Sequence, residues 1–167
     1  NGASDSTLNA ILTAREQASD YTTNSTGLKE NSLRVYCSEQ AHSSIDKAMA
    51  IAGLGKDNLV KIKVNQDFSM EIKDLESQIV RDIENGLHPL MVIAAIGTTG
   101  STAIDPLEAI GKLAQKYNLW LHVDAALAGT ALLLPEMRWI AEGLEYADSY
   151  VFNPHKWMFT NFDASVY

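Results

Sequence analysis

The stretch LMVIAAI at residues 90–96 and the stretch LWLHVD at residues 119–124 are apolar runs of strand length. Runs with so few polar residues are typical of strands that are buried on both faces of a parallel sheet. Between them, residues 106–117 place apolar side chains at helical spacing, and Pro106 suits the first turn of a helix. A strand, a helix and a second strand in succession predict a βαβ unit and therefore parallel pairing.

The same alternation continues on both sides of this unit. Further strands are predicted at residues 33–38, 59–64 and 149–152, and further helices at residues 5–18, 43–50 and 72–83. The first helix has three candidate N-caps, Ser4, Asp5 and Ser6, and the polar residues 24–31 predict a loop. The expected fold class is α/β, with a mostly parallel sheet covered by helices on both faces.

Composition narrows the class of protein. The 167 residues, 46% of them apolar and 20% charged, are typical of a globular domain. The formal net charge is −8 without a cluster of Lys and Arg, so nucleic acid is not an expected partner. Cys37 is the only cysteine, which excludes an internal disulfide and favours a reducing compartment such as the cytoplasm. The apolar runs 89–96 and 125–135 are shorter than the about 20 residues that a membrane helix needs.

The two ends of the chain have the character of internal positions in a longer polypeptide. The chain begins at Asn1 without an initiator methionine or a signal-like segment, and it stops at Tyr167 inside a predicted strand. We therefore expect residues 1–167 to be part of a larger protein.

Chemically versatile side chains follow the predicted strands. In open parallel sheets the ligand binds beyond the carboxyl ends of the strands, which here are residues 38–44, 97–102, 124–129 and 153–157. These segments contain His42, Thr98, Thr99, Asp124, Asn153, His155 and Lys156. His122 lies two residues before Asp124 in the predicted strand. One titratable or hydroxyl group at each strand end predicts a binding or catalytic site.

Each of these residues also has an ordinary structural interpretation. Asp124 shares a strand face with His122, but an aspartate after a strand is equally often a helix N-cap or a salt-bridge partner. Lys156 lies between aromatic residues, an environment that suits an amine that attacks an aldehyde, yet most single lysines are solvent-exposed. His42 alone is more often a structural histidine, and Cys37 in an apolar strand is typical of a core residue.

Four motifs taken together make the pattern specific. They are YCSEQAHSS at residues 36–44, GTTGS at 97–101, HVDAA at 122–126 and NPHKW at 153–157. In this order and spacing the sequence resembles the pyridoxal-phosphate-dependent group II amino-acid decarboxylases, most closely the aromatic-L-amino-acid decarboxylase branch. The resemblance covers essentially the whole chain. It implies the large domain of fold type I, the aspartate aminotransferase-like fold, with residues 1–167 as its central part and the N-terminal segment and C-terminal small domain absent.

The resemblance also implies roles around the cofactor, pyridoxal 5'-phosphate. Lys156 would hold it as a Schiff base, and Asp124 would pair with the pyridine nitrogen. His42 would stack on one face of the ring, and Ala126 would pack against the other. These residues are the expected catalytic and ring-binding set.

Further contacts would serve the phosphate. Ala3 and Ser4 resemble the donors of the family's phosphate-binding turn at the start of a helix, where unpaired amides favour an anion. Asn153 and His155 resemble further contacts on the phosphate side. Supporting roles are implied for Thr99 and His122, and Asp105 matches an acidic position of the family. Leu127 replaces an aromatic residue of the animal enzymes, which leaves the substrate preference open.

The reaction implied is decarboxylation of an L-amino acid, aromatic by the branch that it resembles, to the amine and CO2 through a Lys156 Schiff base and a quinonoid. The family's active site lies between the two subunits of a homodimer, so the isolated chain is expected to be inactive. Decarboxylation of an acidic or other amino acid, aldehyde synthesis and transamination remain open. A remote alternative is a metal-dependent hydrolase that uses His42, His122, Asp124 and His155. No metal is expected under the main hypothesis.

Overall fold

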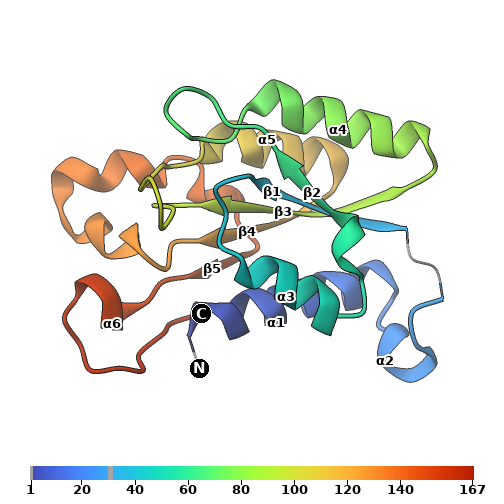
Figure 1. Ribbon diagram of the computed structural model, residues 1–167, viewed down its shortest axis with the longest axis horizontal. Coiled ribbons are helices and arrows are strands. Elements are labelled where there is room, and N and C mark those ends of the chain that lie inside the picture. The colour runs from blue at the N-terminus through green and yellow to red at the C-terminus, as the bar shows by residue number, and fades with distance from the viewer. Residues whose placement is uncertain (1, 30–31) are drawn as a thin grey trace.

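The computed structural model describes residues 2–29 and 32–167 and contains one five-stranded sheet in the order β2-β1-β3-β4-β5 (Figure 1). All neighbouring strands pair in parallel. The strands are β1 (Leu33–Ser38), β2 (Leu59–Ile62), β3 (His88–Ala95), β4 (Trp120–Asp124) and β5 (Ser149–Val151). The predicted α/β fold with a parallel sheet is confirmed.

Helices cover both faces of this sheet. Two long helices on one face are α1 (Ala3–Ala18) and α3 (Ser44–Ile51), and those on the other are α4 (Ile72–Glu84) and α5 (Leu107–Tyr117) (Figure 1). The shorter helical segments are α2 (Thr23–Thr26), η1 (Lys56–Asn58), η2 (Ala128–Leu133), η3 (Pro135–Ala141), η4 (Leu144–Tyr146) and α6 (Pro154–Trp157). Every strand is therefore connected to the next through helical segments, as parallel pairing requires.

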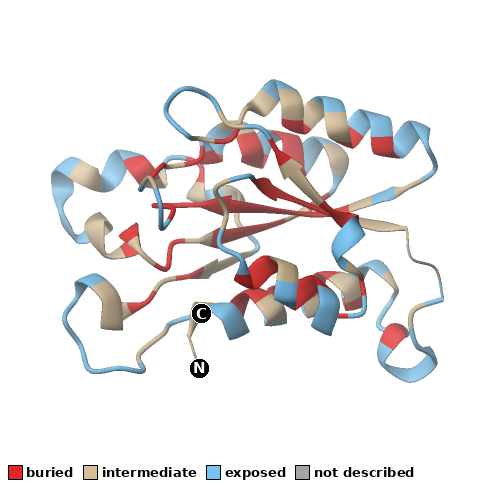
Figure 2. Cartoon of the chain, viewed as in Figure 1, coloured by how far each residue is buried: buried red, intermediate tan, exposed pale blue. Residues whose placement is uncertain are grey.

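The core consists of two layers, one on each side of the sheet. In β3, Met91 and Ile93 pack with α1 and α3, whereas Val92 and Ala94 belong to the cluster formed with α4 and α5. Because successive side chains of a strand point to opposite faces, a strand covered on both sides is apolar throughout. The central strands are buried along most of their length (Figure 2). Cys37 lies in the α1 and α3 layer, as expected of a core residue.

The first helix differs from its prediction. It begins at Ala3, so Ser4, Asp5 and Ser6 lie inside its first turn and do not act as N-caps. The N-cap is Gly2 with φ +92°, a backbone conformation that residues with a side chain rarely adopt. The predicted loop is also partly helical, because Thr23–Thr26 forms α2. Residues 30 and 31 of that loop, like Asn1, lie outside the described residues.

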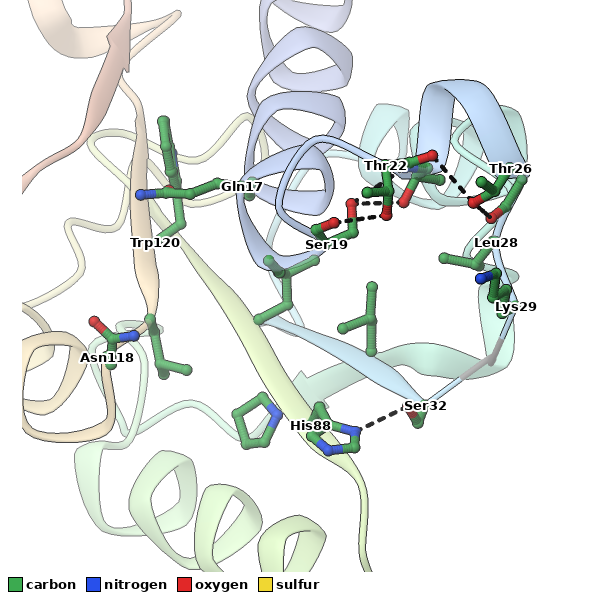
Figure 3. Close-up of a pocket in the computed structure, with 18 of the residues that line it drawn as sticks. Gln17, Ser19, Thr22, Thr26, Leu28, Lys29, Ser32, His88, Asn118 and Trp120 are labelled. Atoms are coloured by element: carbon green, nitrogen blue, oxygen red, sulfur yellow. Dashed lines mark hydrogen bonds between the residues drawn. The ribbon is translucent and has the colours of Figure 1, made fainter.

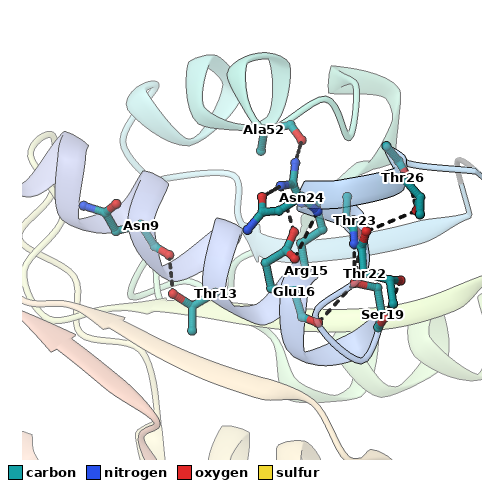
Figure 4. Close-up of polar contacts among 11 residues, drawn as sticks. Asn9, Thr13, Arg15, Glu16, Ser19, Thr22, Thr23, Asn24, Thr26 and Ala52 are labelled. Carbon is teal, nitrogen blue, oxygen red and sulfur yellow. Dashed lines mark hydrogen bonds and ion pairs between the residues drawn. The ribbon is translucent and has the colours of Figure 1, made fainter.

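Polar contacts anchor the far end of α1. Arg15 donates to the carbonyl oxygen of Ala52 at 2.6 Å and contacts the Glu16 carboxylate at 3.0 Å (Figure 4). The other oxygen of Glu16 accepts the backbone N–H of Asn24 at 3.3 Å. These contacts tie the C-terminal end of α1 to the end of α3 and to α2.

In the described part of the chain, no helix combines the length and the apolar character needed to cross a membrane.

Candidate active site

A cavity of about 220 Å³ opens at the carboxyl ends of the strands, where the sequence predicts the site. All nine residues that the resemblance assigns to the cofactor line it: Ala3, Ser4, His42, Thr99, Asp124, Ala126, Asn153, His155 and Lys156. They come from the start of α1, the segment after β1, the loop after β3, the end of β4 and the start of α6. The fold thus brings together residues that are up to 153 positions apart in the chain.

Asp124 lies at the end of β4 and is partly buried. Its Oδ1 accepts the backbone N–H of Ala126 at 3.0 Å, and no cationic side chain of residues 2–29 and 32–167 forms a salt bridge with it. Burial raises the pKa of Asp124, while the bond from Ala126 and the nearby Lys156 and His42 act in the opposite direction. A desolvated carboxylate in this state favours a ligand that brings a positive charge or a proton to it.

Lys156 lies in α6, a short helix whose N-cap is the buried Asn153. The Oδ1 atom of Asn153 accepts a hydrogen bond from the Ser165 hydroxyl at 2.6 Å. His155 Nδ1 lies 2.7 Å from the carbonyl oxygen of Ala164 and 3.5 Å from the Asp163 carboxylate. Residues 163–165 therefore hold the segment that presents the Lys156 amine to the cavity.

The start of α1 forms another wall of the cavity. Ala3 and Ser4 are the first residues of this 16-residue helix. Its N-cap is Gly2, which has no side chain that could accept a hydrogen bond from the first backbone N–H groups. The first backbone N–H groups of a helix have no partner within the helix, and the helix dipole adds a partial positive charge there. This end of the cavity is suited to an anion.

The loop after β3 completes the cavity. Gly97 has φ +80° and packs closely against Ala128, and Thr98 is buried with its hydroxyl 2.8 Å from that of Ser101. Thr99 is exposed and lines the cavity. The glycine permits both the tight turn and the close approach that bring Thr99 to the cavity.

His122, with an implied supporting role, and Asp105, which matches an acidic family position, lie elsewhere. His122 is fully buried beneath the cavity, where its ring contacts Thr7 and Ser149, and it does not line the cavity. Asp105 is 1% exposed and accepts the backbone N–H groups of Met70 and Ala95, each at 2.8 Å. Among the described residues, no group of three or more His, Cys, Asp or Glu side chains is arranged to hold a metal ion.

Other residues of the cavity were not assigned a cofactor contact from the sequence. Ser44, Gly97, Thr98, Phe162 and Asp163 line it together with the predicted set. Ser44 and Thr98 belong to the motifs at residues 36–44 and 97–101, so their position next to His42 and Thr99 was the available signal. Phe162 and Asp163 come from a segment in which no motif indicated a site.

A larger hollow of about 680 Å³ lies at the opposite, amino ends of the strands (Figure 3). It is lined by the end of α1, by α2 and by the beginnings of β3 and β4. Its polar contacts include Ser32 Oγ, 2.9 Å from His88 Nδ1. None of the predicted site residues lines it, so size alone does not identify the functional site.

Comparisons with known proteins agree with this geometry. The sequence pattern of the pyridoxal-dependent decarboxylase conserved domain matches residues 1–167. Tyrosine decarboxylase 4 of Petroselinum crispum is 44% identical over 161 residues, which are 95% of this chain and 32% of that protein. A phenylacetaldehyde synthase of a Rosa hybrid cultivar is 44% identical over 162 residues, 95% of this chain and 32% of that protein.

The fold is shared with solved structures. The crystal structure of Catharanthus roseus tryptophan decarboxylase in complex with L-tryptophan superimposes with a TM-score of 0.91 at 34% identity, covering 99% of this chain and 35% of that one. The chain spans about a third of the length of the curated relatives that it matches. The match over all 167 residues, together with the cavity at the strand ends, places the chain in the pyridoxal-dependent decarboxylase family.

Proposed function

We propose that this chain binds pyridoxal 5'-phosphate in the cavity at the strand ends and is part of an enzyme that decarboxylates an L-amino acid, preferably an aromatic one, to the amine and CO2. The carrying observation is that one cavity combines the N-terminus of α1, which has no side-chain cap at Gly2, the desolvated Asp124 carboxylate and the Lys156 amine. These are an anion site, a partner for a protonated nitrogen and a nucleophile for an aldehyde. The donor set therefore fits this cofactor at both of its ends.

At the phosphate end, the backbone N–H groups of Ala3 and Ser4 and the Ser4 hydroxyl would bind the phosphate oxygens. Asn153 and His155 line the same cavity and would add further contacts. The net charge of the chain is −8, so the helix N-terminus supplies the local positive potential that a phosphate needs here.

At the ring end, Asp124 would hold a proton on the pyridine nitrogen. Its burial makes this pairing strong, because a carboxylate removed from water gains most from a cationic partner. When bound, the cofactor would supply an electron sink for the bond that breaks at the substrate's α-carbon. His42 and Ala126 would hold the ring between them, and Thr99 would lie at its edge.

Lys156 would hold the cofactor through its Nζ atom and release it to the amino group of the substrate. The short helix α6 and the contacts of Asn153 and His155 keep this amine directed at the cavity. Because the same segment carries phosphate contacts and the lysine, it would align the aldehyde with the amine.

A related reaction remains as a second candidate. The relatives at 44% identity include a phenylacetaldehyde synthase as well as a tyrosine decarboxylase. The same cofactor contacts serve both, since the outcome depends on groups that act on the substrate after CO2 has left. Product analysis separates them: an amine supports decarboxylation, and an aldehyde formed with consumption of oxygen supports the synthase reaction.

We also propose that residues 1–167 form the central part of a larger cofactor-binding domain that acts as a cytoplasmic homodimer. The length of the relatives supports the first point. The large exposed apolar side chains of η2, η3 and the residue between them, Leu133, Trp139 and Leu134, provide surface for subunit contact. Light scattering of the full-length protein tests the dimer, and assays of the isolated chain should show no turnover.

The decisive experiment is reconstitution of the full-length protein with pyridoxal phosphate. We expect a visible absorption band and, after borohydride reduction, a label on the tryptic peptide that contains Lys156. The Lys156→Arg variant keeps the positive charge and should lose both signals. A label on another lysine, or wild-type protein without a band, would refute the assignment.

A further inference from the structure

The proposed cofactor contacts are carried by three separate elements. Ala3 and Ser4 start α1, Asp124 ends β4, and Lys156 follows β5 after a short connection. β4 and β5 are paired neighbours, and α1 packs against both of them. The distance between the phosphate end and the ring end of the site therefore depends on how α1 is positioned along these two strands.

One buried side chain contacts all three elements. His122 in β4 is 0% exposed, and its Nε2 atom lies 3.3 Å from the hydroxyl of Thr7 in α1. Its Nδ1 atom lies 2.9 Å from the hydroxyl of Ser149 in β5, the residue with which it is paired in the sheet. The indole N–H of Trp120 also donates to Ser149 Oγ at 2.8 Å.

The ring is neutral in this environment. Burial lowers the pKa of His122 to about 4, so the imidazole carries one N–H and one lone pair at physiological pH. A hydroxyl group can either donate or accept, and Thr7 and Ser149 therefore satisfy the two nitrogens in either tautomer. The contact needs no charge and leaves no ring nitrogen unpaired.

Apolar packing alone does not define the axial position of α1. Its buried face toward the sheet includes Ala10, Ile11 and Ala14, and such contacts are not directional. A helix rises by about 1.5 Å per residue, so a slip of less than one residue would displace the phosphate-binding amides by an ångström. The hydrogen bond of Thr7 near one end gives the helix a defined register together with that of Arg15 near the other. Figure 4 shows the Arg15 contact.

We infer that Thr7, His122 and Ser149 form a positioning network that sets the spacing between the phosphate-binding start of α1 and the Asp124 and Lys156 groups. His122 is two residues from Asp124 on the same strand face, and Thr7 is one helical turn from Ala3 and Ser4. His122 itself does not line the cavity, so it acts through these residues. The inference rests on the proposed function, because the spacing matters only if one ligand spans both ends.

The test uses the full-length protein and the variant Thr7→Val, which removes the hydroxyl and retains a similar shape. Leaving a buried ring nitrogen without its partner should weaken pyridoxal phosphate binding about tenfold and shift the phosphorus NMR resonance of the bound phosphate. Thr7→Ser, which keeps the hydroxyl, should restore both values. Thr13→Val is the matched control, since Thr13 is an exposed threonine of α1 whose hydroxyl donates to Asn9.

A second variant keeps the test decisive if Thr7→Val does not fold. Ser149→Ala removes the partner on the other side of the ring and should weaken binding in the same direction. Where both single variants fold, the losses should be less than additive in the double variant, because both act through His122. Melting temperatures of the cofactor-free forms separate positioning from general destabilisation.

Unchanged affinity and an unchanged phosphorus resonance in Thr7→Val or Ser149→Ala would overturn the inference. A lowered melting temperature with wild-type affinity would overturn it too, since that indicates only a structural role. The proposed function fails differently: in that case the wild-type protein itself takes up no cofactor on Lys156 after borohydride reduction.

Discussion

The backbone N–H of Ser44 donates to Nδ1 of His42 at 3.1 Å, and the Ser44 hydroxyl oxygen lies 2.9 Å from the same nitrogen. An N–H group can only donate, so Nδ1 presents its lone pair to Ser44. In the neutral ring the hydrogen is therefore on Nε2. Because His42 lines the cavity, Ser44 sets both the orientation of the ring and the nitrogen that can donate into the site.

Ser44→Ala should weaken this arrangement without removing it. The backbone N–H remains, but the hydroxyl contact to Nδ1 is lost, and an intramolecular hydrogen bond contributes about 1 kcal/mol. We expect the affinity for pyridoxal phosphate to fall about fivefold in a titration followed by absorbance. Ser43→Ala is the control, because Ser43 is exposed and makes no capping hydrogen bond with its side chain. Equal affinities of Ser44→Ala and wild type would contradict the role of Ser44.

Asp124→Asn should separate cofactor binding from catalysis. The amide has nearly the same shape, but it cannot hold a proton on the pyridine nitrogen by its charge. We expect kcat for decarboxylation to fall by about 10²-fold or more, while Lys156 is still labelled after reduction.

The control for this variant is Asp148→Asn. Asp148 accepts the backbone N–H of Leu121 at 2.8 Å and lies outside the cavity. Like Asp124, it accepts a backbone hydrogen bond near β4, but it has no proposed contact with the cofactor ring. If Asp124→Asn and Asp148→Asn had the same kcat, the charge of Asp124 would not be needed for decarboxylation.

The sequence predicts the parts of this molecule that depend on short-range patterns. The strands and the helices α4 and α5 were predicted to within one or two residues, because their apolar spacing reports directly on burial. Part of the site, including His42, Asp124 and Lys156, follows from the rule that ligands bind at the carboxyl ends of parallel strands. Ala3, Ser4 and Ala126 came only from the resemblance to the decarboxylase family. Even the shared strand face of His122 and Asp124 follows from the strand period.

What the sequence does not predict depends on contacts between distant segments. His122 and Asp124 share a face, yet only the position of α1 determines that Thr7 covers the first and leaves the second to the cavity. The start of α1 was misplaced because three capping-type residues follow a glycine whose backbone conformation forms the actual boundary. Phe162 and Asp163 reach the cavity through a loop, which has no periodic pattern.

Asp105 should make the stability of the protein depend on pH. Burial raises the pKa of this carboxyl to about 6, although Ala95 and Met70 donate hydrogen bonds to it. In the unfolded chain the carboxyl ionises near pH 4, so between about pH 4 and 6 the folded state binds more protons. The free energy of unfolding contributed by Asp105 therefore decreases as the pH rises through this window.

Asp105→Asn removes this titration. The difference in unfolding free energy, variant minus wild type, should become more positive from pH 4 to pH 7, by an amount on the order of 3 kcal/mol. Urea denaturation at several pH values measures it, and groups common to both proteins cancel in the difference. A difference that does not change with pH would contradict the prediction, because it would show that folding does not shift the pKa of Asp105.

Gly97→Ala should disrupt the loop that carries Thr99. A Cβ at residue 97 would lie 2.4 Å from Cβ of Ala128, and φ is +80°, where a side chain adds backbone strain. Gly53→Ala is the matched control, since its φ is +74° and no atom lies within 4 Å of the new Cβ. We expect the control to lose about 1 kcal/mol of stability from strain alone, and Gly97→Ala to lose a further 1–3 kcal/mol from the clash.

The second substitution Ala128→Gly distinguishes the clash from other effects of Gly97→Ala. It removes the Cβ atom that the new methyl group would meet, so the double variant should recover much of the lost stability and of the affinity for pyridoxal phosphate. The strain at φ +80° and the approach to the backbone N of residue 128 at 3.2 Å would remain, so the residual loss should be somewhat larger than that of Gly53→Ala. If the double variant were no better than Gly97→Ala, contact with Ala128 would not be what requires a glycine at the edge of this cavity.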